Sequence, residues 1–198
     1  SYSMYRIAET IRVLLFMTFS ILIFKFYPVT AVMIVLLALF NDFPIMMIAY
    51  DNTEEPPKPA RWDMGHVLTI AGALGAMGLV ESFLLFWYAR QVMHMPKETL
   101  QTFIFLKLLI AGHLTIYVTR RRSWLWTRPF PSWKLLVATE ATQIVGTLAA
   151  VYGWLIPPIG WSYALIVWAY ALIWFFIEDA LKIGVSRFWS ATPAPENH

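Results

Sequence analysis

The stretch that decides the fold reads Leu36-Leu37-Ala38-Leu39-Phe40-Asn41-Asp42-Phe43-Pro44-Ile45-Met46-Met47. It places the carboxylate of Asp42 inside a run apolar enough to cross a bilayer, two residues before Pro44. An aspartate at the centre of a membrane helix costs about 2.5–3.5 kcal/mol on insertion scales, so such residues usually serve a transport pathway. Pro44 has no N–H to donate, and its ring clashes with the carbonyl of Phe40. We therefore expect a helix broken near Asp42–Pro44, with free carbonyl oxygens beside a buried acid.

The composition around this stretch is that of a polytopic membrane protein. Of the 198 residues, 59% are hydrophobic and 14% are charged, whereas soluble domains have about 45–50% and about 25%. The net charge of +3 comes from basic residues in loops between apolar segments, which indicates topology and not nucleic-acid binding. With no cysteine, thiolate metal sites are excluded. The chain begins at Ser1 without a signal-peptide pattern, so we expect a fragment of a longer protein.

The apolar windows predict an all-α bundle of six transmembrane helices, since each crossing needs roughly 20 apolar residues. The windows are 7–26, 29–50, 67–88, 102–118, 135–154 and 161–183. We expect residues 1–50 to form a transmembrane hairpin that carries the ion site, and 51–66 a proline-rich cytoplasmic linker. Residues 67–185 would be a four-helix support domain, and 186–198 a cytoplasmic tail.

The charge distribution across these spans predicts the orientation. An even number of spans puts both termini on one side, and most basic residues lie on that side: Arg6, Lys58, Arg61, Arg120, Arg121, Arg122, Arg128, Lys134, Lys182 and Arg187. The opposite side has Lys25, Arg90 and Lys97. The positive-inside rule therefore places both termini in the cytoplasm.

A candidate partner for Asp42 is Arg12 in the first window. Both lie about fifteen residues from the turn near Tyr27, hence roughly 22 Å from the outer surface at about 1.5 Å per residue. Packing of the hairpin would bring the two together, and an approaching Arg12 would favour loss of the Asp42 proton. The alternative is a permanent structural ion pair. Glu9, one turn before Arg12, is either its i,i+3 partner or a cytoplasmic entry group.

The number of nearby oxygens favours a proton over a metal ion. A dehydrated calcium ion takes roughly 6–8 oxygen ligands. Beside Asp42 the sequence offers Asn41 and the carbonyls that Pro44 frees, between apolar neighbours. We therefore expect no metal site.

Four further ionisable residues lie within the windows. Lys107 and His113 are in the fourth, and Glu81 and Glu140 are in the third and fifth. Interhelical salt bridges are the first interpretation of these residues, and a proton relay is the alternative.

Two other features are interpreted as structural. The small residues at 71–78 form a face that lets another helix approach closely. Glu178 and Asp179, near the cytoplasmic end of the last window, are expected to face water or Lys182.

Several of these motifs together resemble one family. Ile11-Arg12-Val13 followed by Leu39-Phe40-Asn41-Asp42 resembles the fifth and sixth membrane segments of P-type plasma-membrane proton ATPases. Val118-Thr119-Arg120-Arg121-Arg122-Ser123-Trp124, with Arg128-Pro129 after it, is similar to the loop between their eighth and ninth segments. The proline-bearing linker after Asp51 is similar too. The resemblance covers nearly the whole chain and implies the C-terminal membrane half of such a pump, segments five to ten, in the plasma membrane.

The resemblance also implies roles for two residues. The aspartate that matches Asp42 is the central proton acceptor and donor of the family, and the arginine that matches Arg12 promotes release and blocks backflow. The chain departs from plant and fungal members in having Phe43-Pro44 after the aspartate, and Lys107 and His113 where those have glutamine. These departures indicate a prokaryotic-type member.

The catalytic parts of such a pump are absent from the sequence. The 198 residues contain no Asp-Lys-Thr-Gly phosphorylation motif, so the chain should not hydrolyse ATP alone. ATP and Mg²⁺ are expected on cytoplasmic domains of the parent pump. The expected partners are the bilayer, the proton and the N-terminal half of the pump, whose second segment supplies an asparagine to the aspartate. Two alternatives stay open: a stand-alone membrane scaffold or passive conductor, and a P-type pump for Na⁺ or another metal cation.

Overall fold

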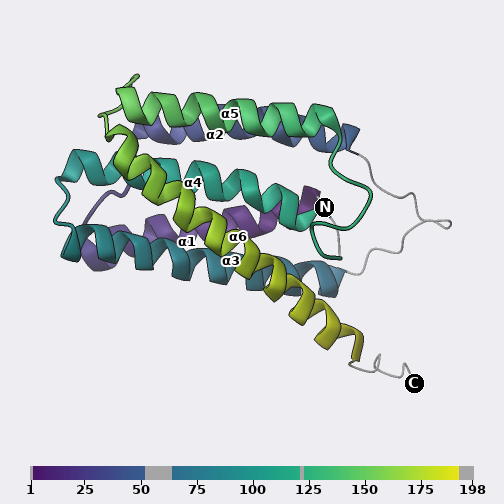
Figure 1. The fold of residues 1–198 in the computed structure, drawn as a ribbon. Helices are drawn as coiled ribbons and strands as arrows, with labels where there is room; N and C mark the ends of the chain where they lie inside the picture. The colour runs from purple at the N-terminus through teal and green to yellow at the C-terminus, as the bar shows by residue number, and fades with distance from the viewer. Residues whose placement is uncertain (1, 52–63, 121–122, 192–198) are drawn as a thin grey trace.

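The computed structural model describes residues 2–51, 64–120 and 123–191, and these ranges are helical with no strand (Figure 1). The main helices are α1 (Tyr2–Phe24), α2 (Ala31–Met47), α3 (Met64–Trp87), α4 (Lys97–Thr119), α5 (Trp133–Tyr152) and α6 (Gly160–Ala191). A 3₁₀ turn, η1 (Ile48–Tyr50), follows α2, and a π turn, η2 (Tyr88–Val92), follows α3. All six main helices are long and apolar enough to cross a membrane, which confirms the predicted fold class. The expected linker and tail lie mostly outside the described residues.

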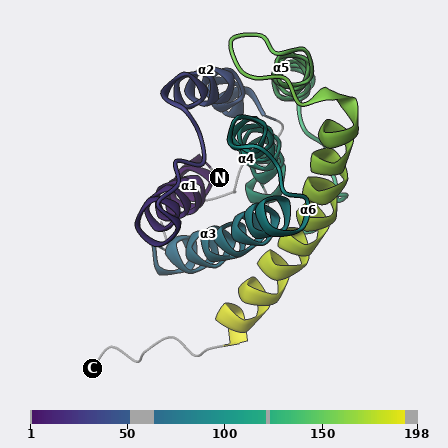
Figure 2. The ribbon, with the colours of Figure 1, turned by 90° about the vertical axis from the view of Figure 1, so that its left-hand side faces the viewer.

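Helix α4 is the centre of the bundle. Its residues are buried without interruption from Leu100 to Thr119, and it contacts each of the other five main helices. Seen along the bundle, α1 and α3 lie on one side of α4 and α2 and α5 on another, while α6 runs obliquely along a third side, at the right of the view (Figure 2). The apolar core gathers around α4 and includes Phe16, Phe86 and Phe103.

The expected packing of the first two spans against each other is wrong. Helix α1 packs mainly on α3, and α2 packs mainly on α5 and α4 (Figure 2). The cause lies in the small-residue face of α3, because Ile11 and Arg12 of α1 lie directly on Gly75 and Gly78. Glycines allow the two backbones to approach closely, which strengthens packing in a membrane.

Helix α2 is also less disrupted than predicted. It begins after Thr30, whose hydroxyl accepts the backbone N–H of Met33 at 3.3 Å. It then continues as an α-helix through Pro44 to Met47, and its winding changes only at η1. The break expected near Asp42–Pro44 therefore does not occur there. A hydrogen bond from another helix, described below, satisfies the carbonyl that the proline frees.

Candidate functional site

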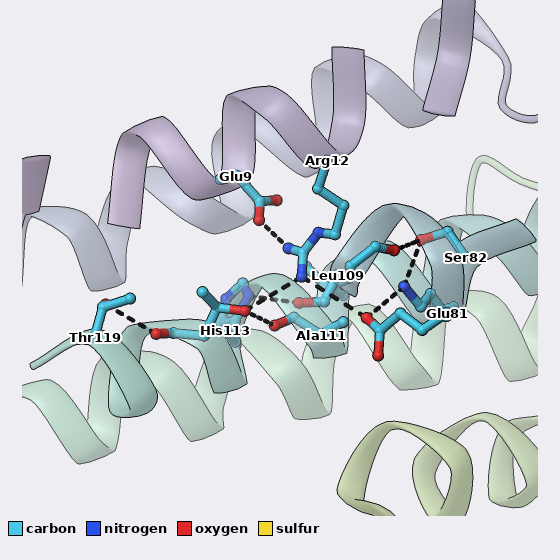
Figure 3. Close-up of polar contacts among 11 residues, drawn as sticks. Glu9, Arg12, Glu81, Ser82, Leu109, Ala111, His113 and Thr119 are labelled. Carbon is cyan, nitrogen blue, oxygen red and sulfur yellow. Dashed lines mark hydrogen bonds and ion pairs between the residues drawn. The ribbon is translucent and has the colours of Figure 1, made fainter. Parts of the chain in front are cut away.

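A buried cluster of charges lies where α1, α3 and α4 meet (Figure 3). Arg12 of α1 is only 2% exposed and forms an ion pair with Glu9 one turn earlier on the same helix. Its Nη1 donates to the Thr115 hydroxyl of α4 at 3.2 Å and lies 4.0 Å from Oε1 of Glu81 on α3. Glu9 is thus the i,i+3 partner that was one of its two expected roles.

Lys107 of α4 completes this cluster from the other side of Glu81. Its Nζ is fully buried, lies 2.8 Å from Oε1 of Glu81 and donates to the Ser82 hydroxyl at 2.6 Å. The structure therefore brings Lys107 and Glu81 together as an interhelical salt bridge. Since Glu81 also lies near Arg12, the two cations share one carboxylate.

Helix α6 adds a carboxylate that the sequence placed elsewhere. Glu178 was expected to face water or Lys182, but it is 3% exposed and lies beside Thr115, near Arg12, Lys107 and Glu81. The error has a physical cause: α6 crosses the bundle and turns this face toward α4 and α3, so nearness to the end of a span did not mean exposure.

The neighbouring Asp179 has a different environment. It is buried and pairs with Lys182 at 2.7 Å, and it accepts the backbone N–H of Leu125 at 3.2 Å. Lys182 also donates to the carbonyls of Val118 and Ser123, at 2.8 and 2.9 Å. This ion pair therefore fastens the loop after α4 to α6.

Asp42 does not join the cluster. It is exposed on α2, and no ion pair or hydrogen bond links its side chain to Arg12 or to any other part of the described chain. The expected contact of Arg12 with Asp42 is thus absent from this structure. The reason is the helix pairing, because α1 turns Arg12 toward α3 and α4 while α2 lies apart from α1.

A groove separates α1 from α2 beside these residues. It has a volume of about 470 Å³ and is lined by Glu9, Thr10, Val13, Leu14, Met17, Val29, Ile34, Leu37, Ala38 and Asn41. Asn41 has a buried Oδ1 without a hydrogen-bond partner in the described chain, and Asp42 follows it directly. Glu9 lines the groove and also binds Arg12, so it connects the groove to the cluster.

His113 of α4 has a role in α2 that the sequence did not reveal. Its ring is fully buried, with Nε2 3.1 Å from the Phe40 carbonyl and 2.7 Å from the Thr142 hydroxyl. Its Nδ1 faces the Leu109 carbonyl at 2.8 Å. Phe40 is four residues before Pro44, so His113 binds the carbonyl that lost its helical partner. In the tautomer that carries the ring proton on Nε2, His113 donates to this carbonyl and so stabilises α2 where it passes Pro44.

Glu140, the other candidate for a salt bridge, does not meet His113. Its Oε1 accepts the hydroxyl of Tyr117 at 3.0 Å, on the side of α4 that faces α5. The four ionisable residues thus divide into one ion pair, Glu81 with Lys107, and two residues with neutral hydrogen-bond partners.

Sequence reasoning missed one polar junction, which joins the end of α4, the end of the second span and the start of α5. Arg120 donates through Nε to Asp51 at 2.8 Å and through Nη1 to the Pro129 carbonyl at 3.0 Å. Asp51 also accepts the backbone N–H of Ser132, the N-cap of α5, at 2.9 Å. Both residues stand out in the sequence, Arg120 in the Thr-Arg motif and Asp51 at the end of the second span. Nothing in the sequence indicates that they form a pair.

A bundle of membrane-spanning helices with ionisable groups buried around its central helix has the architecture of an ion-transport protein. Comparisons with known proteins identify the family. No protein-family model matches the chain. It is 50% identical over 183 residues to the "Putative cation-transporting ATPase" of Methanocaldococcus jannaschii, covering 92% of the chain and 23% of that protein. It is 30% identical over 161 residues to Plasma membrane ATPase 1 of Saccharomyces cerevisiae, covering 78% of the chain and 17% of that protein.

The Plasma membrane ATPase 1 of Candida albicans gives the same identity and the same shares. The chain belongs to the P-type cation-transporting ATPases, as its resemblance implied. It spans less than a quarter of the length of these curated relatives.

Proposed function

We propose that this chain is the C-terminal membrane half, segments five to ten, of a P-type pump that exports protons across the plasma membrane. ATP and Mg²⁺ would bind on cytoplasmic domains elsewhere in the parent pump, and the six helices would handle the ion. Both termini would lie in the cytoplasm, on the side where the basic residues gather. The likeness to Plasma membrane ATPase 1 over 78% of the chain supports this assignment.

The observation that carries the proposal is the position of Asp42. It lies inside a membrane-spanning helix, is exposed, and follows Asn41, whose buried amide oxygen has no partner within the described ranges. A carboxylate at this depth is costly unless other groups accommodate it. The face of α2 that carries Asp42 is therefore the face that the N-terminal half of the pump would cover, with Asp42 as proton acceptor and donor.

Arg12 would gate this acid from the far side of the groove. In this state Glu9 binds the guanidinium, and no cation of the described residues forms an ion pair with Asp42. Phosphorylation in the cytoplasmic domains would pull on α1 and bring Arg12 toward Asp42, which favours release of the proton. Exporting one charge against 100 mV costs about 2.3 kcal/mol, which the ATP-driven motion must supply.

The test is an Asp42→Asn substitution in the complete pump, assayed for proton transport in sealed vesicles. We expect transport to be abolished while the protein still assembles, because asparagine keeps the shape of the side chain and cannot exchange a proton. Glu98→Gln is the matched control: Glu98 is an exposed acid in the first turn of α4, and its loss should leave transport intact. Sustained pumping by Asp42→Asn would overturn the proposal.

The ion itself has a separate test, since one relative is named only as cation-transporting. ATPase activity of the complete pump is measured in buffers that lack Na⁺, K⁺ and Ca²⁺, with each cation then added back. We expect activity without any of them, because few free oxygens surround Asp42 and a metal cation needs several. Strict dependence on one metal cation would replace the proton with that ion.

A further inference from the structure

The buried cluster has more acids than bases. At the junction of α1, α3, α4 and α6 the carboxylates are Glu9, Glu81 and Glu178, and the cations are Arg12 and Lys107. If every group were ionised, one negative charge would stay uncompensated in the interior of the bundle.

The pairing pattern shows which carboxylate is left over. Arg12 pairs with Glu9, and Lys107 pairs with Glu81. Glu178 is 3% exposed and has no ion pair within 4.0 Å anywhere in the described chain. On its own helix, Asp179 and Lys182 already neutralise each other.

Two further ionisable groups on the neighbouring helices have other partners. On α4, His113 faces α2 and α5. On α5, Glu140 is bound to Tyr117. The excess acid of the junction is therefore Glu178.

The hydrogen bonds of Thr115 show in which form Glu178 fits. The carboxyl of Glu178 lies beside the Thr115 hydroxyl. That hydroxyl already donates its single hydrogen to the Ala111 carbonyl at 2.8 Å, and its oxygen accepts from Arg12 at 3.2 Å. A hydroxyl oxygen has two lone pairs, so Thr115 has an acceptor position left and no hydrogen to give. In this arrangement of hydrogen bonds, a carboxylic acid can donate to the acceptor position that Thr115 has left.

We propose that Glu178 binds a proton and is a second proton site of the membrane half, separate from Asp42. A carboxylate without a partner in an apolar interior is strongly disfavoured, and the group takes up a proton instead. A metal cation fits poorly here, because Arg12 and Lys107 would repel it and their ion pairs use the oxygens of Glu9 and Glu81. The proposal does not depend on which ion the pump transports.

The proton on Glu178 sets how strongly Arg12 is held in the cluster. With Glu178 neutral, the guanidinium has Glu9 as its close partner and Glu81 at 4.0 Å. Loss of the proton would add a negative charge on the α6 side of Arg12 and draw the guanidinium away from α2. Glu178 would thereby bias Arg12 without touching Asp42.

The experiment is infrared spectroscopy of the complete pump at neutral pH, in H₂O and in D₂O. A protonated carboxyl gives a C=O band that carboxylates lack and that shifts on deuteration. We expect the difference spectrum between wild type and Glu178→Gln to contain this band, and Glu178→Asp to shift its frequency. Glu98→Gln, at an exposed position, should leave the band unchanged.

Thermal unfolding supplies the second readout. Glutamine replaces a neutral acid without changing the charge of the cluster, so the melting temperature of Glu178→Gln should stay close to that of the wild type. The proposal would be overturned if Glu178→Gln left the C=O band in place, or if Glu178→Asp left its frequency unchanged. So would a Glu178→Gln pump that fails to assemble. Neither the infrared band nor the melting temperature measures transport. Both therefore test the Glu178 proposal independently of the result for Asp42→Asn.

Discussion

Glu81 is the residue on which the buried cluster depends. Its Oε1 lies 2.8 Å from Lys107 and 4.0 Å from Arg12, so it compensates the ammonium directly and the guanidinium at longer range. In a protein interior, removal of one member of such a pair costs about 3–5 kcal/mol because the other charge is stranded. Replacement of both members by neutral groups of similar size is often tolerated.

We therefore predict opposite behaviour for single and double substitutions of this pair. Lys107→Met should lower the free energy of unfolding by about 3–5 kcal/mol, because Glu81 loses its partner. Glu81→Gln combined with Lys107→Met should restore most of that loss. Unfolding in detergent is measured for the wild-type pump, the two single variants Lys107→Met and Glu81→Gln, and the double variant, with the exposed Lys97→Met as control. Losses that simply add in the double variant would contradict the pairing.

The sequence placed Arg12 and Asp42 at one depth but could not place them side by side. Residue spacing fixes the height of a side chain along a helix, while its direction around the axis depends on which helices meet. Here that direction follows from Gly78, against which the stem of Arg12 lies. The salt bridge of Lys107 with Glu81 could be anticipated from charge, because a buried cation in a span needs an anion. The burial of Glu178 could not be anticipated, since nothing in the sequence shows that α6 crosses α4.

At the scale of elements, α2 and α4 are joined by the carbonyl that Pro44 frees. His113 reaches Phe40 at 3.1 Å, two residues before Asp42, so this bond also sets the shape of the helix at the proposed proton site.

We predict that the cost of losing His113 depends on Pro44. His113→Ala should destabilise the complete pump by about 1–3 kcal/mol, the cost of a buried carbonyl left unpaired. In a Pro44→Ala background the cost should be smaller, because the alanine has an N–H that can bind the Phe40 carbonyl within the helix. Unfolding of the two single variants, the double variant and the wild type gives the coupling energy. Equal costs in both backgrounds would show that His113 acts in another way.

The close approach of α1 to α3 gives a second prediction at this scale, with a control on the same helix. A Cβ added at Gly78 would collide with the Arg12 stem, whereas one added at Gly72 would meet nothing within 4 Å. Gly78→Ala should therefore displace Arg12, lower stability by about 1–3 kcal/mol and slow transport. Gly72→Ala should be neutral, or stabilising by about 0.5–1 kcal/mol. Melting curves and transport assays on both variants decide this, and equal effects would contradict it.

For the whole molecule, the orientation proposed from the basic residues predicts which loops are cytoplasmic. The 198 residues contain no cysteine, so an introduced cysteine reports its own position within this half. In intact cells, and in a background without other cysteines, a membrane-impermeant maleimide should label Glu98→Cys, at the outer end of α4, and spare Trp126→Cys, in the loop before α5. Both positions are exposed. Reversed labelling would invert the proposed topology.

The spans themselves were predictable because a bilayer crossing demands a long apolar run, and each of the six runs has a helix in the structure. The pairing of helices was not, because membrane helices are apolar on most sides and give little sign of which side faces a neighbour. The extent of α6 shows the same limit. It runs to Ala191, beyond the window that ended at 183, because a helix can continue past the apolar region.

The complete enclosure of α4 has a consequence for how the protein is made. No side of this helix from Leu100 to Thr119 is left to face lipid, and it contains Lys107. A lone lysine at the centre of a helix costs about 2.5–3.5 kcal/mol to insert. Helix α3, which is synthesised just before, brings Glu81 to the same place. We infer that α4 enters the membrane with α3, its charge already neutralised, and that α5 and α6, which are synthesised after it, then close around it.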